Sequence, residues 1–274
     1  MPDQSHGHPD GGRAGQTALI EMIDVDKEFA NGTVAVRDMS LVINKGEFVS
    51  FLGPSGCGKS TALKMISGLL SVSNGSITVN GHLAGQSPDA SDIGYVFQEA
   101  NLLPWATVFE NVYLPLKLRG LSRKEASARV EEALAMVGLA KFAKSYPRQL
   151  SGGMRMRVSI ARAMVTKPKL LLMDEPFAAL DEMTRAKLND DVLQLWESQG
   201  LTVIFVTHSV FESVYLSSRV VVMAARPGRV VHDIALGDGY PRNAAYRMTA
   251  AYTESCRLVS NALEGTMDHV DLNH

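Results

Sequence analysis

Cysteine is scarce in this sequence, with only Cys57 and Cys256 among 274 residues. Two thiols cannot form a disulfide framework, and the amino terminus lacks the basic start and apolar run of a secretory signal. We therefore expect a reducing, cytoplasmic setting. Long apolar runs are also missing, because residues 170–173 and 203–206 fall far short of the roughly 20 residues that a membrane-spanning helix needs. The sequence predicts no such helix.

An excess of either charge is absent as well, since 27 basic and 29 acidic side chains leave a formal net charge of -2. A protein that binds nucleic acid mainly through phosphate neutralisation usually has a basic excess or a concentrated basic block, and the sequence has neither. We therefore expect no nucleic-acid partner. The 46% of hydrophobic residues is enough for a buried core, and the length allows one large domain or two smaller ones.

The order of patterns along the chain favours an α/β fold. Residues 1–17 have no apolar periodicity and are predicted to be a flexible tail. Short β-rich runs at residues 19–25, 34–43 and 47–52 follow, and then a helical pattern at 62–70. The spacing next predicts helices over 108–118 and 122–137, the second starting with a capping box of Ser and Glu at 122 and 125.

Strand and helix patterns alternate again from residue 170 to 223, which is typical of a parallel sheet covered on both faces, here with a helical insertion at about 99–165. We expect one domain over 18–238 and a helical tail over 239–274. That tail is expected to dock on its own domain, although binding to a partner is an alternative. Its apolar face is predicted to comprise Ala245, Met248, Tyr252, Cys256, Val259 and Leu263.

A glycine-rich loop follows the third expected strand and fits the phosphate-loop pattern of glycine, four residues, Gly-Lys and Ser or Thr. Its residues are Gly53, Pro54, Ser55, Gly56, Cys57, Gly58, Lys59, Ser60 and Thr61. Glycine suits this loop because the backbone wraps a phosphate with its N–H groups pointing inward. Lys59 is expected to reach the β- and γ-phosphates, and Ser60 to ligate Mg²⁺. Cys57 is expected to be a small residue tolerated there, with a redox role as the alternative.

Two adjacent carboxylates, Asp174 and Glu175, end the apolar strand at 170–173. Such acids often only begin a loop or cap a helix. Together with the phosphate loop, however, they indicate that Asp174 lies near the Mg²⁺ ligands and Glu175 near an attacking water.

A second anion site is predicted where Leu150 precedes Ser151, Gly152 and Gly153. Ser151 resembles a helix N-cap, and the two glycines leave backbone N–H groups open at the helix start. With these motifs in this order, residues 19–236 resemble the ABC transporter ATPase family, whose signature is Leu-Ser-Gly-Gly followed usually by Gln. The resemblance implies a P-loop NTPase fold with a mainly parallel core sheet, an N-terminal antiparallel β subdomain and an inserted helical subdomain, with ATP and Mg²⁺ as cofactors.

The resemblance also implies roles for single residues. Phe29 would stack on the adenine, and Gln98 would touch Mg²⁺ and the attacking water. Glu175 would be the general base, Asp181 would communicate across a dimer, and His208 would contact the γ-phosphate.

The sequence departs from the family pattern at three positions. Met154 replaces the usual signature Gln, so that side chain's contact to nucleotide is not expected. Ala179 and Ser209 stand where many relatives have Ser and Asp.

The family resemblance further implies partners. Two copies would dimerise head to tail, because each nucleotide lies between one chain's phosphate loop and the other's signature. A permease is expected to dock near residues 98–115, where Leu102, Leu103, Pro104 and Trp105 form an apolar patch that is either interface or core. The segments 97–105, 153–157 and 225–229 most resemble bacterial nitrate, sulfonate and taurine importers, which also use an extracytoplasmic solute-binding protein.

We therefore expect a peripheral protein on the cytoplasmic face of the bacterial inner membrane. The alternatives are an ABC exporter ATPase and a soluble ABC ATPase that acts on nucleic acid or protein.

Overall fold

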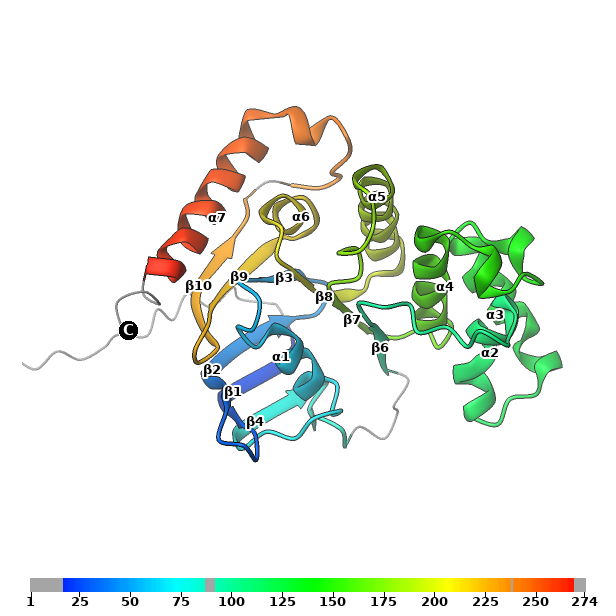
Figure 1. Cartoon of the computed structure of the whole chain (residues 1–274), viewed down its shortest axis with the longest axis horizontal. Coiled ribbons are helices and arrows are strands. Elements are labelled where there is room, and N and C mark those ends of the chain that lie inside the picture. Colours follow the sequence, from blue (N-terminus) through cyan, green and yellow to red (C-terminus); the bar gives the residue numbers. More distant parts are fainter. Residues whose placement is uncertain (1–16, 87–91, 238, 269–274) are drawn as a thin grey trace, which may run out of the picture.

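The computed structural model describes residues 17–86, 92–237 and 239–268. The predicted tail at residues 1–17 lies outside them except for Thr17. Two β-sheets form the centre of the molecule (Figure 1). The smaller sheet is antiparallel. In spatial order its strands are β2 (Val34–Asn44), β1 (Ala18–Glu28), β4 (Asn74–Val79) and β5 (His82–Leu83).

The larger sheet has six strands, which all run parallel except the edge strand β10. In spatial order they are β10 (Arg229–Ala235), β9 (Arg219–Ala224), β3 (Phe48–Leu52), β8 (Thr202–Thr207), β7 (Leu170–Asp174) and β6 (Ile93–Val96). The mainly parallel core sheet and the antiparallel N-terminal sheet confirm the predicted fold class.

Helices cover both faces of the six-stranded sheet (Figure 1). On one face lie α5 (Glu182–Gln199), α6 (Val210–Leu216) and α7 (Ala250–Asp268); on the other lie α1 (Lys59–Ile66) and the antiparallel sheet. Alternate side chains of β3 therefore enter two cores. Phe48 and Leu52 belong to one cluster, whereas Val49 and Phe51 belong to the other. Burial on both faces explains why the central strands are continuously apolar.

Three helices between β6 and β7 gather at one end of the molecule, on the right of Figure 1. They are α2 (Val108–Leu118), α3 (Arg123–Met136) and α4 (Gly152–Met164). Short 3-10 helices at Ala140–Phe142 and Pro147–Gln149 link the last two. The predicted capping box before α3 is confirmed, because the Ser122 side chain accepts a bond from the Glu125 backbone N–H and the Glu125 carboxylate accepts one from the Ser122 backbone N–H.

The structure corrects two predictions about the fold and contains one strand that the sequence does not predict. The helix predicted at 62–70 is α1, which already starts at Lys59 within the phosphate-loop motif and ends at Ile66, because the chain turns at Gly68 with a φ of +75°. Strand β10 is not predicted, although it pairs with β9 along its whole length.

The apolar face of the tail begins later than the sequence predicts, since Ala245 is exposed and Met248 is 88% exposed, both before α7 starts. Tyr252, Cys256 and Val259 are buried against the rest of the chain. Among the described residues no helix combines the length and apolarity that crossing a bilayer requires.

The strand register brings three loops to one edge of the large sheet. Leu52 at the end of β3 pairs with Thr207 at the end of β8, and Asp174 at the end of β7 pairs with Val206. Because these strands are parallel, the loops after them emerge side by side at the carboxyl edge, where open α/β sheets bind ligands.

Candidate functional site

The glycine-rich loop runs from β3 into α1, as the phosphate-loop pattern requires. Gly56 and Gly58 have φ values of +81° and +88°, which side-chain-bearing residues rarely adopt. A Cβ atom on Gly58 would also lie 2.7 Å from the Ala35 carbonyl oxygen. The loop therefore needs glycine at both positions, and it leaves backbone N–H groups open at the start of α1.

Lys59 is held inside this loop, with only 4% of its surface exposed. Its Nζ donates hydrogen bonds to the carbonyl oxygens of Gly53 at 2.8 Å and Pro54 at 3.0 Å. The same Nζ lies 3.8 Å from Glu175 Oε1. The neighbouring Cys57 is fully buried, and burial raises the pKa of its thiol although Lys59 opposes the shift. A protonated, buried thiol agrees with a small packing residue and not with a reactive thiolate.

Ser60, in the first turn of α1, and Asp174, the last residue of β7, meet at the carboxyl edge of the large sheet. The Ser60 hydroxyl donates a hydrogen bond to Asp174 Oδ1 at 2.7 Å. The Tyr95 hydroxyl donates to Asp174 Oδ2 at 3.4 Å, and burial, together with the Asp174 charge, raises the pKa of Tyr95. Sequence patterns alone gave no signal for Tyr95, because its contact with Asp174 spans two strands of the sheet.

Glu175 follows directly, in a left-handed backbone conformation with a φ of +43° that non-glycine residues rarely adopt. Its Oε2 lies 3.3 Å from Nδ1 of His208, which follows β8. The neighbouring Thr207 ties this turn to α6, because its hydroxyl donates to Glu212 at 2.6 Å and accepts from the Ser209 N–H at 3.0 Å. Glu175 and His208, two of the four side chains expected to act in catalysis, are therefore adjacent.

Lys59, Ser60 and Glu175 border a groove of about 560 Å³. Asp174 and His208 contact Ser60 and Glu175 but are not part of its lining. Its lining comprises Thr33, Val34, Ala35, Ser55, Gly56, Cys57, Gly58, Lys59, Ser60, Thr61, Gln98, Glu175 and Arg226. Gln98, from the loop after β6, thus faces the same space as the phosphate loop. Phe29 is not in the lining; it is 39% exposed and lies on the turn between β1 and β2, where its backbone N–H donates to the Thr33 carbonyl at 2.9 Å.

The groove also contains a residue that sequence analysis did not select, Arg226 in the turn between β9 and β10. This turn packs behind the phosphate loop, since a Cβ on Gly228 would lie 2.4 Å from the Cys57 carbonyl oxygen and 2.5 Å from that of Ala35. In the sequence, segment 225–229 is notable only because it resembles one group of importers. That resemblance does not predict that Arg226 lines the groove.

The signature residues form a second cluster outside this lining. Ser151 caps α4 by accepting a 3.3 Å hydrogen bond from the Met154 N–H. A Cβ on Gly153 would lie 2.5 Å from Thr184 Cγ2, so the signature glycines pack against the start of α5. Asp181 caps α5, and its bond from the Thr184 N–H lowers the pKa of its carboxyl group. The predicted site residues are therefore divided between two separate places on one chain.

Residues 36–178 match the protein family described as ABC transporter. The chain belongs to this family. The taurine import ATP-binding protein TauB of Rhizobium johnstonii is 49% identical over 197 residues, 72% of this chain and 74% of that protein. The aliphatic sulfonates import ATP-binding protein SsuB of Bacillus thuringiensis subsp. konkukian is 43% identical over 227 residues, 82% of this chain and 88% of that protein.

Among solved structures, the dimeric post-hydrolysis state of the ATP-binding cassette MJ0796 bound to ADP and Pi matches with a TM-score of 0.71 and 35% identity. The match covers 81% of this chain and 100% of that one. This ABC protein is accordingly an ATP-binding subunit and an ATP hydrolase, and its two-sheet architecture is the fold of the family's cassettes.

Proposed function

We propose that this ABC ATPase drives solute import as a head-to-tail homodimer bound to a permease. The observation that supports a dimer is the separation of the two anion sites. The groove is lined by the phosphate loop, whereas Ser151 and Gly153 lie on α4 against the start of α5. A chain whose signature cannot reach its own groove needs a second copy to complete the site, and a twofold axis completes both sites at once.

Complementation tests this arrangement. Lys59→Ala disables the phosphate loop, and Ser151→Phe blocks the signature with a bulky side chain. Each variant alone should be inactive, but a mixed dimer contains one site in which both halves are intact. Recovery of ATPase activity on mixing supports the shared site. If either pure variant stays active, or mixing restores nothing although mixed dimers form, each chain acts alone.

The groove residues can bind a nucleoside triphosphate. The N–H groups of the phosphate loop would surround the β-phosphate, and Lys59 would move from the Gly53 and Pro54 carbonyls to the β- and γ-phosphates. Phe29, whose backbone N–H donates to the carbonyl of the groove residue Thr33, would stack on the adenine.

Magnesium fits the oxygen donors of this site. Ser60 and Asp174 already contact each other at 2.7 Å, and Gln98 lines the same groove. Mg²⁺ prefers oxygen ligands and is usually held by one or two carboxylates together with substrate phosphates. No cluster of three or more His, Cys, Asp or Glu side chains suited to a metal exists in the described ranges, which agrees with a site that phosphates complete. Bound Mg²⁺ would offset the charge that develops on the phosphoryl oxygens.

Glu175 is the group best placed to accept a proton from the attacking water. Its carboxylate lies at the carboxyl edge between Lys59 and His208, at 3.8 Å and 3.3 Å. His208, which contacts Glu175, would contact the γ-phosphate, and Gln98 would orient the water. Asp181, beside the signature, would link the two sites across the dimer.

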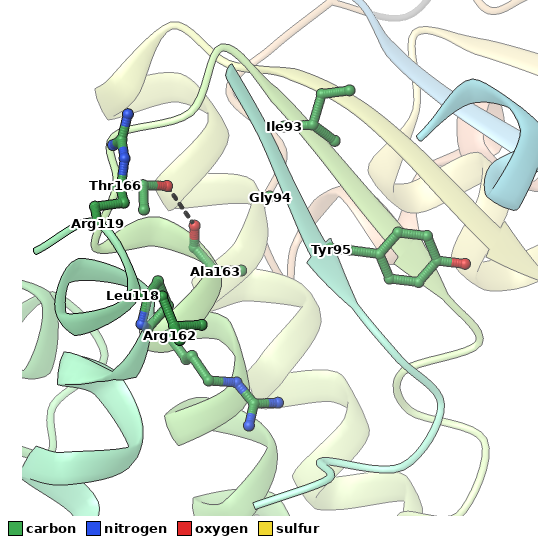
Figure 2. A pocket seen from close by; sticks show the side chains of 9 residues that line it. Ile93, Gly94, Tyr95, Leu118, Arg119, Arg162, Ala163 and Thr166 are labelled. Atoms are coloured by element: carbon green, nitrogen blue, oxygen red, sulfur yellow. Dashed lines mark hydrogen bonds between the residues drawn. The ribbon is translucent and has the colours of Figure 1, made fainter. Parts of the chain in front are cut away.

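The permease would dock beside the loop that follows Gln98. Trp105 is 74% exposed on this loop, whereas Leu102 packs partly against the core. Nearby, a pocket of about 320 Å³ opens at the edge of β6 next to the ends of α2 and α4 (Figure 2). Leu118 at its rim is 79% exposed, and Arg119 and Arg162 line it. An amphipathic permease helix with an acidic residue would suit this surface.

We propose a sulfonate- or taurine-type solute, because TauB and SsuB are importers of that class by name. The permease would hold the subunit at the cytoplasmic face of the inner membrane and receive solute from an extracytoplasmic binding protein. Residues 18–238 would form the ATPase domain, with the helical insertion at about 99–165 and a tail from 239. Co-purification from membranes with a permease, and solute uptake that stops in Glu175→Gln, would support import; recovery with ribosomes or DNA and no permease would contradict it.

A further inference from the structure

The loop at residues 98–107, called the Gln98 loop below, is fixed to helices α4 and α2 by two side chains. The first is Arg162 of α4. Its Nη2 donates to the Ala100 carbonyl oxygen and its Nη1 to that of Asn101, both at 2.7 Å. Figure 2 shows this side chain reaching from α4 toward the chain that leaves the carboxyl end of β6. The bonded carbonyls lie two and three residues after Gln98.

The second side chain is Asn111 of α2, which is fully buried. Its Oδ1 accepts from the Leu103 N–H at 2.7 Å, and its Nδ2 donates to the carbonyl oxygens of Leu103, Ala106 and Thr107 at 3.2, 3.1 and 2.9 Å. Arg162 thus holds the start of the Gln98 loop and Asn111 holds its end. Gln98 itself is exposed at the groove, ahead of both attachments.

Arg162 and the signature belong to the same helix, since α4 begins at Gly152, directly after Ser151. A rotation of α4 that moves the signature must therefore also move the two carbonyls that Arg162 holds. We propose that Arg162 is a positioning residue that couples the signature helix to Gln98. The inference rests on the proposed function, because it gives Gln98 a role in orienting the attacking water.

The surroundings of Arg162 favour this role over that of an ordinary ion pair. In the described part of the chain its guanidinium bonds to the two loop carbonyls and, at 3.4 Å, to Ser159 Oγ, and to no carboxylate. Burial lowers the pKa of this guanidinium. Asn101 has a left-handed φ of +45°, so the backbone at this attachment adopts an uncommon conformation. A charged donor at short distance stabilises such a conformation strongly.

The test measures steady-state ATPase kinetics and loop motion in the full-length protein. Arg162→Gln removes the charge and the fork of donors, and Arg162→Lys keeps the charge with a single ammonium. We expect Arg162→Gln to lower kcat about 10- to 100-fold, the usual cost of losing a group that orients a functional side chain. KM for ATP should stay unchanged, because Lys59 and the phosphate loop are untouched. Arg162→Lys should recover part of kcat.

Trp105 supplies a direct readout of the loop. The chain has two tryptophans, so Trp196→Phe leaves Trp105 as the single reporter. We expect its fluorescence anisotropy to fall in Arg162→Gln and to recover partly in Arg162→Lys. Arg129 of α3 is the matched control, because its Nη2 donates at 3.1 Å to the Val165 carbonyl and not to the loop. Arg129→Gln should leave kcat and Trp105 anisotropy as in the parent protein.

An unchanged kcat in Arg162→Gln, a rise in KM that accounts for the lost activity, or unaltered Trp105 anisotropy would overturn the coupling. An equal loss of kcat in Arg129→Gln would also overturn it, since any disturbed arginine in the insertion would then suffice. If Arg162→Gln does not fold, the Lys variant decides by the same two measurements. Failure of the parent protein to hydrolyse ATP would instead contradict the proposed function.

Discussion

Replacing Glu175 by Gln removes one negative charge and almost nothing else. The amide has the same shape as the carboxylate and can still contact His208, but it cannot accept a proton from water. A general base typically contributes about 10²- to 10⁴-fold to a rate. The barrier to hydrolysis should therefore rise by about 3–5 kcal/mol.

The same substitution should strengthen ATP binding. Lys59 Nζ lies 3.8 Å from Glu175 Oε1, with 3% and 19% of these side chains exposed. Two unit charges at about 4 Å attract by about 4 kcal/mol at an effective dielectric of 20, before the cost of desolvation is subtracted. This attraction competes with the phosphates for Lys59, and the negative charge of Glu175 also repels them. Without it, the ATP-bound dimer should accumulate.

The assay combines three measurements on the parent protein and Glu175→Gln. Phosphate release gives turnover, equilibrium titration gives the Kd for ATP, and size-exclusion chromatography with light scattering gives the mass with and without ATP. We expect turnover to fall about 10²- to 10⁴-fold, Kd to fall and a dimer to persist with ATP. Turnover within tenfold of the parent protein would refute the role of Glu175, and weaker ATP binding would refute the electrostatic argument.

The other predictions concern binding, stability and docking. Lys59→Ala should raise the Kd for ATP at least tenfold, because charge-assisted bonds to phosphate are worth about 1.5–3 kcal/mol each; an unchanged Kd by titration contradicts this. Asn111→Ala, which loses four hydrogen bonds of a buried side chain, should lower the free energy of unfolding by about 2–4 kcal/mol in urea, and Asn111→Asp should lower it at least as much, because its second carboxylate oxygen would face three carbonyl oxygens. Trp105→Glu should abolish permease recovery from membranes, whereas Leu258→Glu, an exposed position on α7, should not.

Local order in the sequence was sufficient to predict most of the fold. The strand, glycine loop and helix at 47–66 are contiguous, and loop chemistry depends on neighbours in the chain. The sequence does not predict where α1 ends, however, because the turn at Gly68 packs closely against Gly85, which is distant in the sequence. A Cβ atom on Gly68 would lie 2.3 Å from the Cα atom of Gly85. Strand β10 is missed because its half-exposed residues alternate weakly and pairing with β9 stabilises it.

The site divides in the same way. The sequence identifies the phosphate loop, the two carboxylates and the signature, since each is a short motif whose chemistry lies in consecutive residues. The pairing of the strands decides which of these motifs meet in one site, and sequence patterns do not reveal that pairing. Pairing of Leu52 with Thr207 and of Asp174 with Val206 brings the first two motifs and His208 together.

By itself, then, the sequence determined the type of chemistry, because phosphate binding requires glycines and a lysine in one loop and hydrolysis requires adjacent carboxylates. Only the tertiary structure decided how those residues act together. Long-range contacts place Tyr95 on Asp174, Arg226 in the groove and Arg162 on the Gln98 loop. Each of these contacts joins segments from different elements, and the packing of the two sheets and the helical insertion brings those segments together.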